Sequence, residues 1–210
     1  MSKGRLGPGH RWIVLVLWVL MATAVPTGRA QAGPEKGGRE IQIWSGGGHA
    51  YKGVANDTGL WSLGVRYGWV LTNPRGPGFL RGRLESVVEV VPVFLAFQPN
   101  GTSYAVGLNP LVTKWMFDTR RRVVPYFELG SGGLISHNQI PPGTSRVNFT
   151  SSGAFGLHRA GDRFTWSAEI RYMHISNAGI SSNNPGVNTL QLRIGLGMFT
   201  PRGGRNRANP

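Results

Sequence analysis

The chain has 210 residues, with 23 Lys and Arg against 9 Asp and Glu, a formal net charge of +14, and no cysteine. The missing cysteine excludes disulfide bonds, thiolate metal sites and cysteine nucleophiles, so any chemistry must use oxygen or imidazole groups. Glycine (32) and proline (14) interrupt the whole chain, and long helical periodicity is absent, which favours a β-rich domain with many turns.

The N-terminal segment is typical of a secretory signal peptide. Lys3 and Arg5 precede the apolar run 12–25, and small residues follow at 30–32. The apolar run is shorter than the roughly 20 residues that a membrane-spanning helix needs. We therefore expect residues 1–32 to be cleaved and not to act as a membrane anchor.

The charge balance after cleavage indicates an anionic partner. Four of the 23 basic residues lie in 1–32, so 19 remain against 9 acidic residues, a net charge of +10. These basic residues are scattered, and the one tight cluster, 120–122, lies in a predicted turn. Basic helices and aromatic RNA-binding motifs are missing, so no nucleic acid partner is expected. A phosphorylated lipid surface fits better.

The mature chain repeats one pattern, in which apolar and polar residues alternate with period two over segments of about ten residues. This pattern predicts an all-β fold, an eight-stranded antiparallel transmembrane β-barrel over 33–200, followed by a basic C-terminal tail at 201–210. The predicted strands are 39–47, 60–71, 80–95, 103–116, 123–134, 146–158, 163–176 and 187–199.

The strands have one apolar and one polar face. In 60–71 the apolar face carries Trp61, Tyr67 and Trp69, too much bulk for the narrow lumen of eight strands. In 80–95 the expected lumen face carries Arg81, Arg83, Glu85 and Glu89, and the expected lipid face carries Leu84, Val88, Val90 and Phe94. Because acids and bases share the inward faces, they can pair there. A soluble β-sandwich or lipocalin-like barrel, with the faces reversed, stays as the alternative.

Three polar residues are expected to converge where the last two predicted strands are joined. Residues of equal parity share a face of a strand, so His174 and Ser176 continue the outward series of 163–176, and Asn188 opens that of 187–199. A serine becomes a nucleophile when imidazole removes its proton and a third group orients the imidazole. The three residues therefore form a candidate hydrolytic site, whereas Glu169 points into the lumen and is rejected as the orienting group. Polar residues at the membrane rim, without catalysis, are the alternative.

The stretch "RYMHISNAGISSNNPGVN", Arg171 to Asn188, resembles the lipid A 3-O-deacylase (PagL) family of outer-membrane barrels. The resemblance implies that Ser176 is the nucleophile and His174 the general base. It also implies an oxyanion-stabilising or positioning environment from Asn177, Gly179 and Asn184. Asn188 departs from the family, because the family triad has a glutamate there. A Ser-His-Asn arrangement is known from outer-membrane phospholipase A.

These observations predict a serine esterase that removes the 3-O-linked acyl chain of lipid A through an acyl-enzyme. We expect it in the bacterial outer membrane, with its site at the outer leaflet, lipid A (lipopolysaccharide) and membrane lipids as partners, and no cofactor or metal. The spacing of His49, His137 and His158 does not suit a metal site. The alternatives are an outer-membrane phospholipase and a non-enzymatic adhesin, structural or porin-like barrel. The sequence does not decide whether the barrel forms a homodimer.

Overall fold

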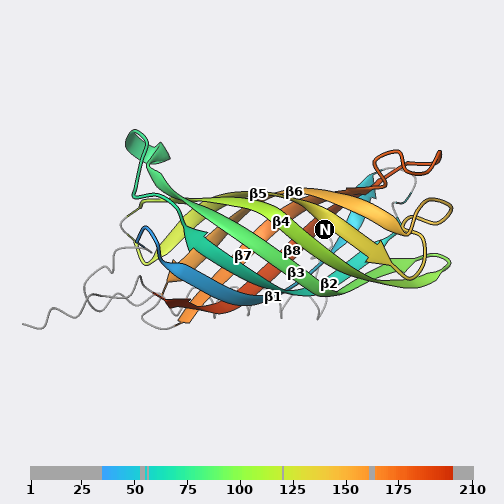
Figure 1. Cartoon of the computed structure of the whole chain (residues 1–210), viewed down its shortest axis with the longest axis horizontal. Helices are drawn as coiled ribbons and strands as arrows, with labels where there is room; N and C mark the ends of the chain where they lie inside the picture. The colour runs from blue at the N-terminus through green and yellow to red at the C-terminus, as the bar shows by residue number, and fades with distance from the viewer. Residues whose placement is uncertain (1–34, 53–54, 56, 120, 161–163, 201–210) are drawn as a thin grey trace, which may run out of the picture. The chain divides into compact units, whose positions relative to one another are not determined.

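The structure is a computed structural model that describes residues 35–52, 55, 57–119, 121–160 and 164–200. The predicted signal peptide, 1–32, and the tail, 201–210, lie outside these residues. The described chain forms one closed antiparallel barrel in which each strand pairs with its neighbours in the sequence and the last pairs with the first (Figure 1). The strands are β1 (Arg39–Lys52), β2 (Gly59–Val70), β3 (Gly82–Gln98), β4 (Gly101–Phe117), β5 (Val123–Ser136), β6 (Val147–Ala160), β7 (Phe164–Ser176) and β8 (Val187–Thr200).

All eight predicted strands are present, and the prediction of an all-β barrel is confirmed. The one helical element described is the short 3-10 helix η1 (Gly78–Leu80), between β2 and β3. No helix in the described ranges is long and apolar enough to cross a membrane.

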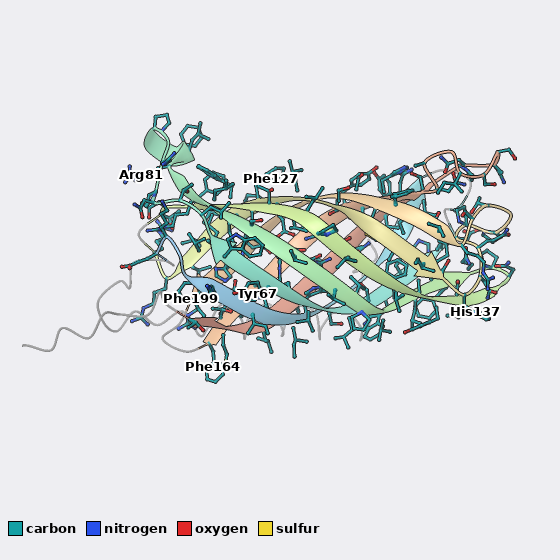
Figure 2. All side chains as sticks on the ribbon, viewed as in Figure 1. Tyr67, Arg81, Phe127, His137, Phe164 and Phe199 are labelled. Atoms are coloured by element: carbon teal, nitrogen blue, oxygen red, sulfur yellow. The ribbon has the colours of Figure 1, made fainter. Side chains whose placement is uncertain are left out.

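The apolar face of the sheet lies outside the barrel. Tyr67, Ile170 and Leu196 are 41%, 56% and 66% exposed, whereas Arg66 and Glu169, on the alternate face, are 3% and 4% exposed. Figure 2 shows Phe127 and Phe164 standing out from the wall. A soluble barrel would hide such residues inside, so the soluble alternative is wrong. The exposed apolar surface is the lipid-facing surface of a transmembrane barrel.

Paired charges fill part of the lumen. Three arginines and three glutamates from six inward positions form one cluster, in which Arg193 lies 2.7 Å from Glu89 and Arg171 lies 2.7 Å from Glu169. Glu128 bridges Arg66 and Arg171. An eight-stranded barrel is only wide enough for its own side chains. The cluster therefore argues against the porin-like alternative.

Removing one member of this cluster should destabilise the barrel. Glu128 is fully buried and contacts two arginines, so Glu128→Gln leaves positive charge uncompensated in the lumen. We expect a loss of about 3–5 kcal/mol in the free energy of unfolding, measured by urea titration in lipid vesicles with the gel shift of heated samples as readout. Asp118→Asn, which breaks the rim pairs with Arg81 and Arg83, should cost less than about 1 kcal/mol. Equal losses would contradict this account.

Strand β3 departs from the predicted alternation. Its pairing with β4 shifts between Val91 and Phe94, so two residues, Pro92 and Val93, face one on β4. Such a bulge reverses the facing of the residues that follow. Phe94, expected on the lipid side, is therefore buried in the lumen. The prediction for Arg81 was also wrong, because this residue precedes β3 and pairs with Asp118 at the rim.

The glycine-rich stretch 45–48 lies within β1, which extends five residues beyond its predicted end. A Cβ atom at Gly48 would collide with the Leu190 carbonyl oxygen and lie 2.7 Å from the Gln191 Cα atom. Gly48 therefore permits the close approach of β1 and β8, which closes the barrel.

The connections between strands lie at the two ends of the barrel. The loops after β5 and β7 lie at one end, and η1 lies at the opposite end (Figure 1). Figure 2 labels His137 at the first end and Arg81, Phe164 and Phe199 at the second. The residues predicted to be catalytic lie where β7 enters its loop, and hence at the first end.

Candidate active site

The structure brings His174 and Asn188 together on the lipid-facing side of the wall. They are register partners on β7 and β8, so their Cβ atoms share one face. Both are half-buried, while Met173 and Ile175, on either side of His174, point into the lumen and are buried. The parity prediction for these two residues matches the structure, although their catalytic role stays a prediction.

One carboxamide oxygen connects the polar groups of this face. The Oδ1 atom of Asn188 lies 2.8 Å from Nδ1 of His174 and accepts a second hydrogen bond of 2.8 Å from the Tyr172 hydroxyl. Because Oδ1 can only accept, the proton of a neutral His174 must lie on Nδ1. The Nε2 atom then has a free lone pair, as a general base requires.

Gly186 forms the surface against which the imidazole rests. A Cβ atom at Gly186 would lie 2.8 Å from Cε1 and 3.5 Å from Nε2 of His174, and the glycine has φ +68°. A larger residue would therefore push the ring away from its position and would strain the backbone. Sequence reasoning named neither Gly186 nor Tyr172 as site residues. The sequence Asn184-Pro185-Gly186, typical of a turn, was the feature that could have indicated a special role for the glycine.

Ser176 ends β7 on the same face, half-buried. Among the described contacts its hydroxyl has no hydrogen bond, including none to His174. Residues i and i+2 of a strand lie about 7 Å apart, so contact between these two side chains requires suitable rotamers. Catalytic hydrogen bonds often form only when substrate binds.

The loop after β7 is held by asparagine side chains. Asn177 is 1% exposed; its Oδ1 accepts from the Gly179 amide at 2.9 Å, and its Nδ2 donates to the Asn183 carbonyl at 2.9 Å. The Asn177 amide donates to Oδ1 of Asn184 at 3.0 Å. The side chain of Asn177 and the amide of Gly179 thus donate within the loop, and they hold its shape.

Asn184 is different, because only one end of its carboxamide is engaged. Its Oδ1 accepts from the Asn177 amide, while its Nδ2 donates to no group among the described residues. This exposed side chain therefore presents two N–H donors, fixed in direction by the bond at the other end. Such a donor suits an oxyanion.

His49, His158 and Glu169 lie outside the group formed by His174, Ser176 and Asn188. His158 is buried in the lumen, where Nε2 lies 3.0 Å from Glu40 Oε1, and His49 lies on β1. Glu169 is buried beside Arg171, as parity predicted for a lumen residue. Nowhere in the described ranges do three His, Asp or Glu side chains converge as metal ligands.

Comparison with known proteins identifies the family. The family model described as lipid A 3-O-deacylase (PagL) matches residues 56–197, which include every candidate site residue. Comparison with curated protein sequences finds no relative.

Two solved structures share the fold. The outer membrane enzyme PagL has a TM-score of 0.57 and 19% identity, over 73% of this chain and 97% of that chain. Neisserial surface protein A has a TM-score of 0.52 and 14% identity, over 78% of this chain and 99% of that chain. At these identities the structures show the barrel fold, whereas the family match covers most of the sequence. The chain belongs to the lipid A 3-O-deacylase (PagL) family.

Proposed function

We propose that this chain is an outer-membrane serine esterase that removes the 3-O-linked acyl chain of lipid A through an acyl-enzyme on Ser176. The hydrogen bond between His174 Nδ1 and Asn188 Oδ1, made on the lipid-facing wall, carries the proposal. A histidine facing lipid is costly unless it has a partner and a function. Here it has the partner that a general base needs.

In the first half-reaction Ser176 Oγ attacks the acyl carbonyl carbon, and His174 Nε2 takes the hydroxyl proton. The negative charge on the former carbonyl oxygen is met by the free amide of Asn184. The ester bond to the sugar oxygen then breaks, and the imidazolium gives its proton to that oxygen. The products of this step are the sugar hydroxyl and an ester on Ser176.

In the second half-reaction a water molecule attacks the acyl-enzyme. His174 takes a proton from this water and returns it to Ser176 Oγ as the acyl–oxygen bond breaks. The fatty acid leaves and the serine is restored. Asn188 keeps the imidazole in one tautomer throughout, but as a neutral amide it stabilises the imidazolium less than a carboxylate would.

The lipid-facing position of these groups favours a substrate that arrives laterally through the bilayer. Lipid A meets this condition in the outer leaflet, and its phosphates suit a basic protein. A phospholipid also arrives laterally, so the phospholipase alternative needs an experiment to separate it.

Expression in a Gram-negative host whose lipid A keeps its 3-O chain separates these functions. We expect the mass spectrum of lipid A to lose one hydroxyacyl group and the phospholipids to stay intact. Lysophospholipid with unchanged lipid A would support the phospholipase instead. No change in either lipid, from a barrel that migrates as folded, would reject the enzyme and leave an adhesin or structural barrel.

The proposed orientation can be checked with the cysteine-free chain. Ile180 lies in the β7–β8 loop, 63% exposed, and Phe79 lies in η1 at the opposite end, 87% exposed. We expect a membrane-impermeant maleimide to label Ile180→Cys on intact cells and Phe79→Cys only after lysis. The reverse pattern would place the site at the inner leaflet and contradict access from lipopolysaccharide.

A further inference from the structure

The geometry points to Tyr172 as a positioning residue that sets which end of the Asn188 carboxamide meets His174. This inference rests on the proposed function, because it concerns how the general base is prepared. The family glutamate does not need such a residue, since either oxygen of a carboxylate accepts the imidazole proton. Asparagine at position 188 creates the need.

A carboxamide has one accepting and one donating end. If the Asn188 amide group faced His174, it would donate to Nδ1, and the imidazole proton would move to Nε2. That tautomer cannot take the proton of Ser176. The two orientations of Asn188 therefore correspond to an active and an inactive base, and some contact must favour the first.

Tyr172 makes that contact. Its hydroxyl donates to Asn188 Oδ1 at 2.8 Å, so the oxygen accepts from Tyr172 and from His174 together. A phenol is a better hydrogen-bond donor than acceptor, so it favours the oxygen over the amide group beside it. Tyr172 and His174 are two residues apart on one face of β7. His174 lies opposite Asn188 of β8 and Tyr172 lies diagonal to it, opposite Leu190, which places both donors within reach of one oxygen.

The ring of Tyr172 is itself held from the far side of Asn188. Tyr51 meets it edge-on, with ring centroids 6.4 Å apart and planes at 66°. Tyr51 lies at the irregularity in the pairing of β1 with β8, between Ala50 and Lys52. The ring contact therefore joins three adjacent strands around Asn188, and limits where the Tyr172 hydroxyl can go.

A double-mutant cycle tests the inference. Tyr172→Phe removes only the hydroxyl, and Asn188→Asp replaces the amide by a carboxylate of the same shape. With Asn188 present we expect Tyr172→Phe to lower kcat about tenfold with KM unchanged, the size of effect seen when one hydrogen bond is lost. In the Asn188→Asp background the carboxylate needs no orientation, so we expect Tyr172→Phe to lower kcat by less than about twofold. Tyr67→Phe is the matched control. Tyr67 lies on β2 and also faces lipid, so its substitution should leave kcat and KM unchanged.

Two readouts need no lipid A. Labelling of Ser176 by a fluorophosphonate should slow in Tyr172→Phe by the same factor as kcat. The ¹⁵N spectrum of His174 should show the Nδ1–H tautomer in the wild type and a mixture of tautomers in Tyr172→Phe. If the wild type is labelled at Ser176 but does not hydrolyse lipid A, lipid A is rejected as the substrate and the role of Tyr172 still stands. Equal losses in both backgrounds, or an unchanged ¹⁵N spectrum, would overturn that role.

Discussion

Ser176→Ala should lower the rate of lipid A deacylation by at least about 10³-fold, the scale seen when a serine nucleophile is removed. Ser176 ends β7 on the face that carries His174 and Asn188, and alanine fits at this half-buried position without disturbing the wall. The measurement is the rate of fatty acid release from lipid A in mixed micelles, beside the gel mobility of the folded barrel.

The control for Ser176 is another serine of the lipid-facing wall. Ser131 lies on β5, exposed, and pairs with Ser151 of β6. Ser131→Ala removes a hydroxyl from the same surface without touching the site, and should keep full activity. A folded Ser176→Ala protein that still deacylates lipid A would show that another group is the nucleophile.

Asn184→Asp should lower kcat by about 10²-fold, the scale of losing one oxyanion donor. The substitution keeps the oxygen that accepts from the Asn177 amide, so the loop keeps its shape. It replaces the free Nδ2 donor by an oxygen, which repels the negative charge that develops on the acyl carbonyl. Steady-state kinetics should show the loss in kcat, with KM little changed.

Asn183→Asp separates a lost donor from an added charge. Asn183 precedes Asn184 in the same loop and donates to the Gly143 carbonyl at 3.1 Å, away from His174 and Asn188. The substitution introduces the same negative charge one residue away and should lower kcat by less than about threefold. If both variants lose the same activity, charge in the loop and not the Asn184 donor explains the effect.

The barrel could be predicted because its physical signal repeats in every strand. Alternation such as that of Trp61, Tyr67 and Arg66 is set by the pleat of each strand, independently of its partners. The acids and bases that share one face favoured an inward polar face but left the soluble alternative open, and the exposed apolar residues of the structure decide between them. A bulge leaves no repeating pattern in the sequence. The prediction that Phe94 faces lipid was wrong because its direction depends on the bulge in the pairing of β3 with β4.

Of the candidate site, only the face on which each strand residue lies could be predicted from the alternation of the strands. Parity placed His174, Ser176 and Asn188 on one face, and the structure joins His174 to Asn188. The hydrogen bonds of the loop depend on backbone turns, including the φ of +84° at Gly179, which no periodicity encodes. The family resemblance implied one role for Asn177 and Asn184 together, whereas in the structure both ends of the Asn177 carboxamide are hydrogen-bonded within the loop and the Asn184 amide group is left free.

The position of Asn188 has a consequence for when the proposed site can form. Asn188 belongs to β8, the last strand of the described barrel, and reaches His174 through the pairing of β8 with β7. Until these two strands pair, His174 and Ser176 have no ordered carboxamide beside them. Under the proposed function, we expect the esterase to gain activity late in assembly, once the last strand is in place.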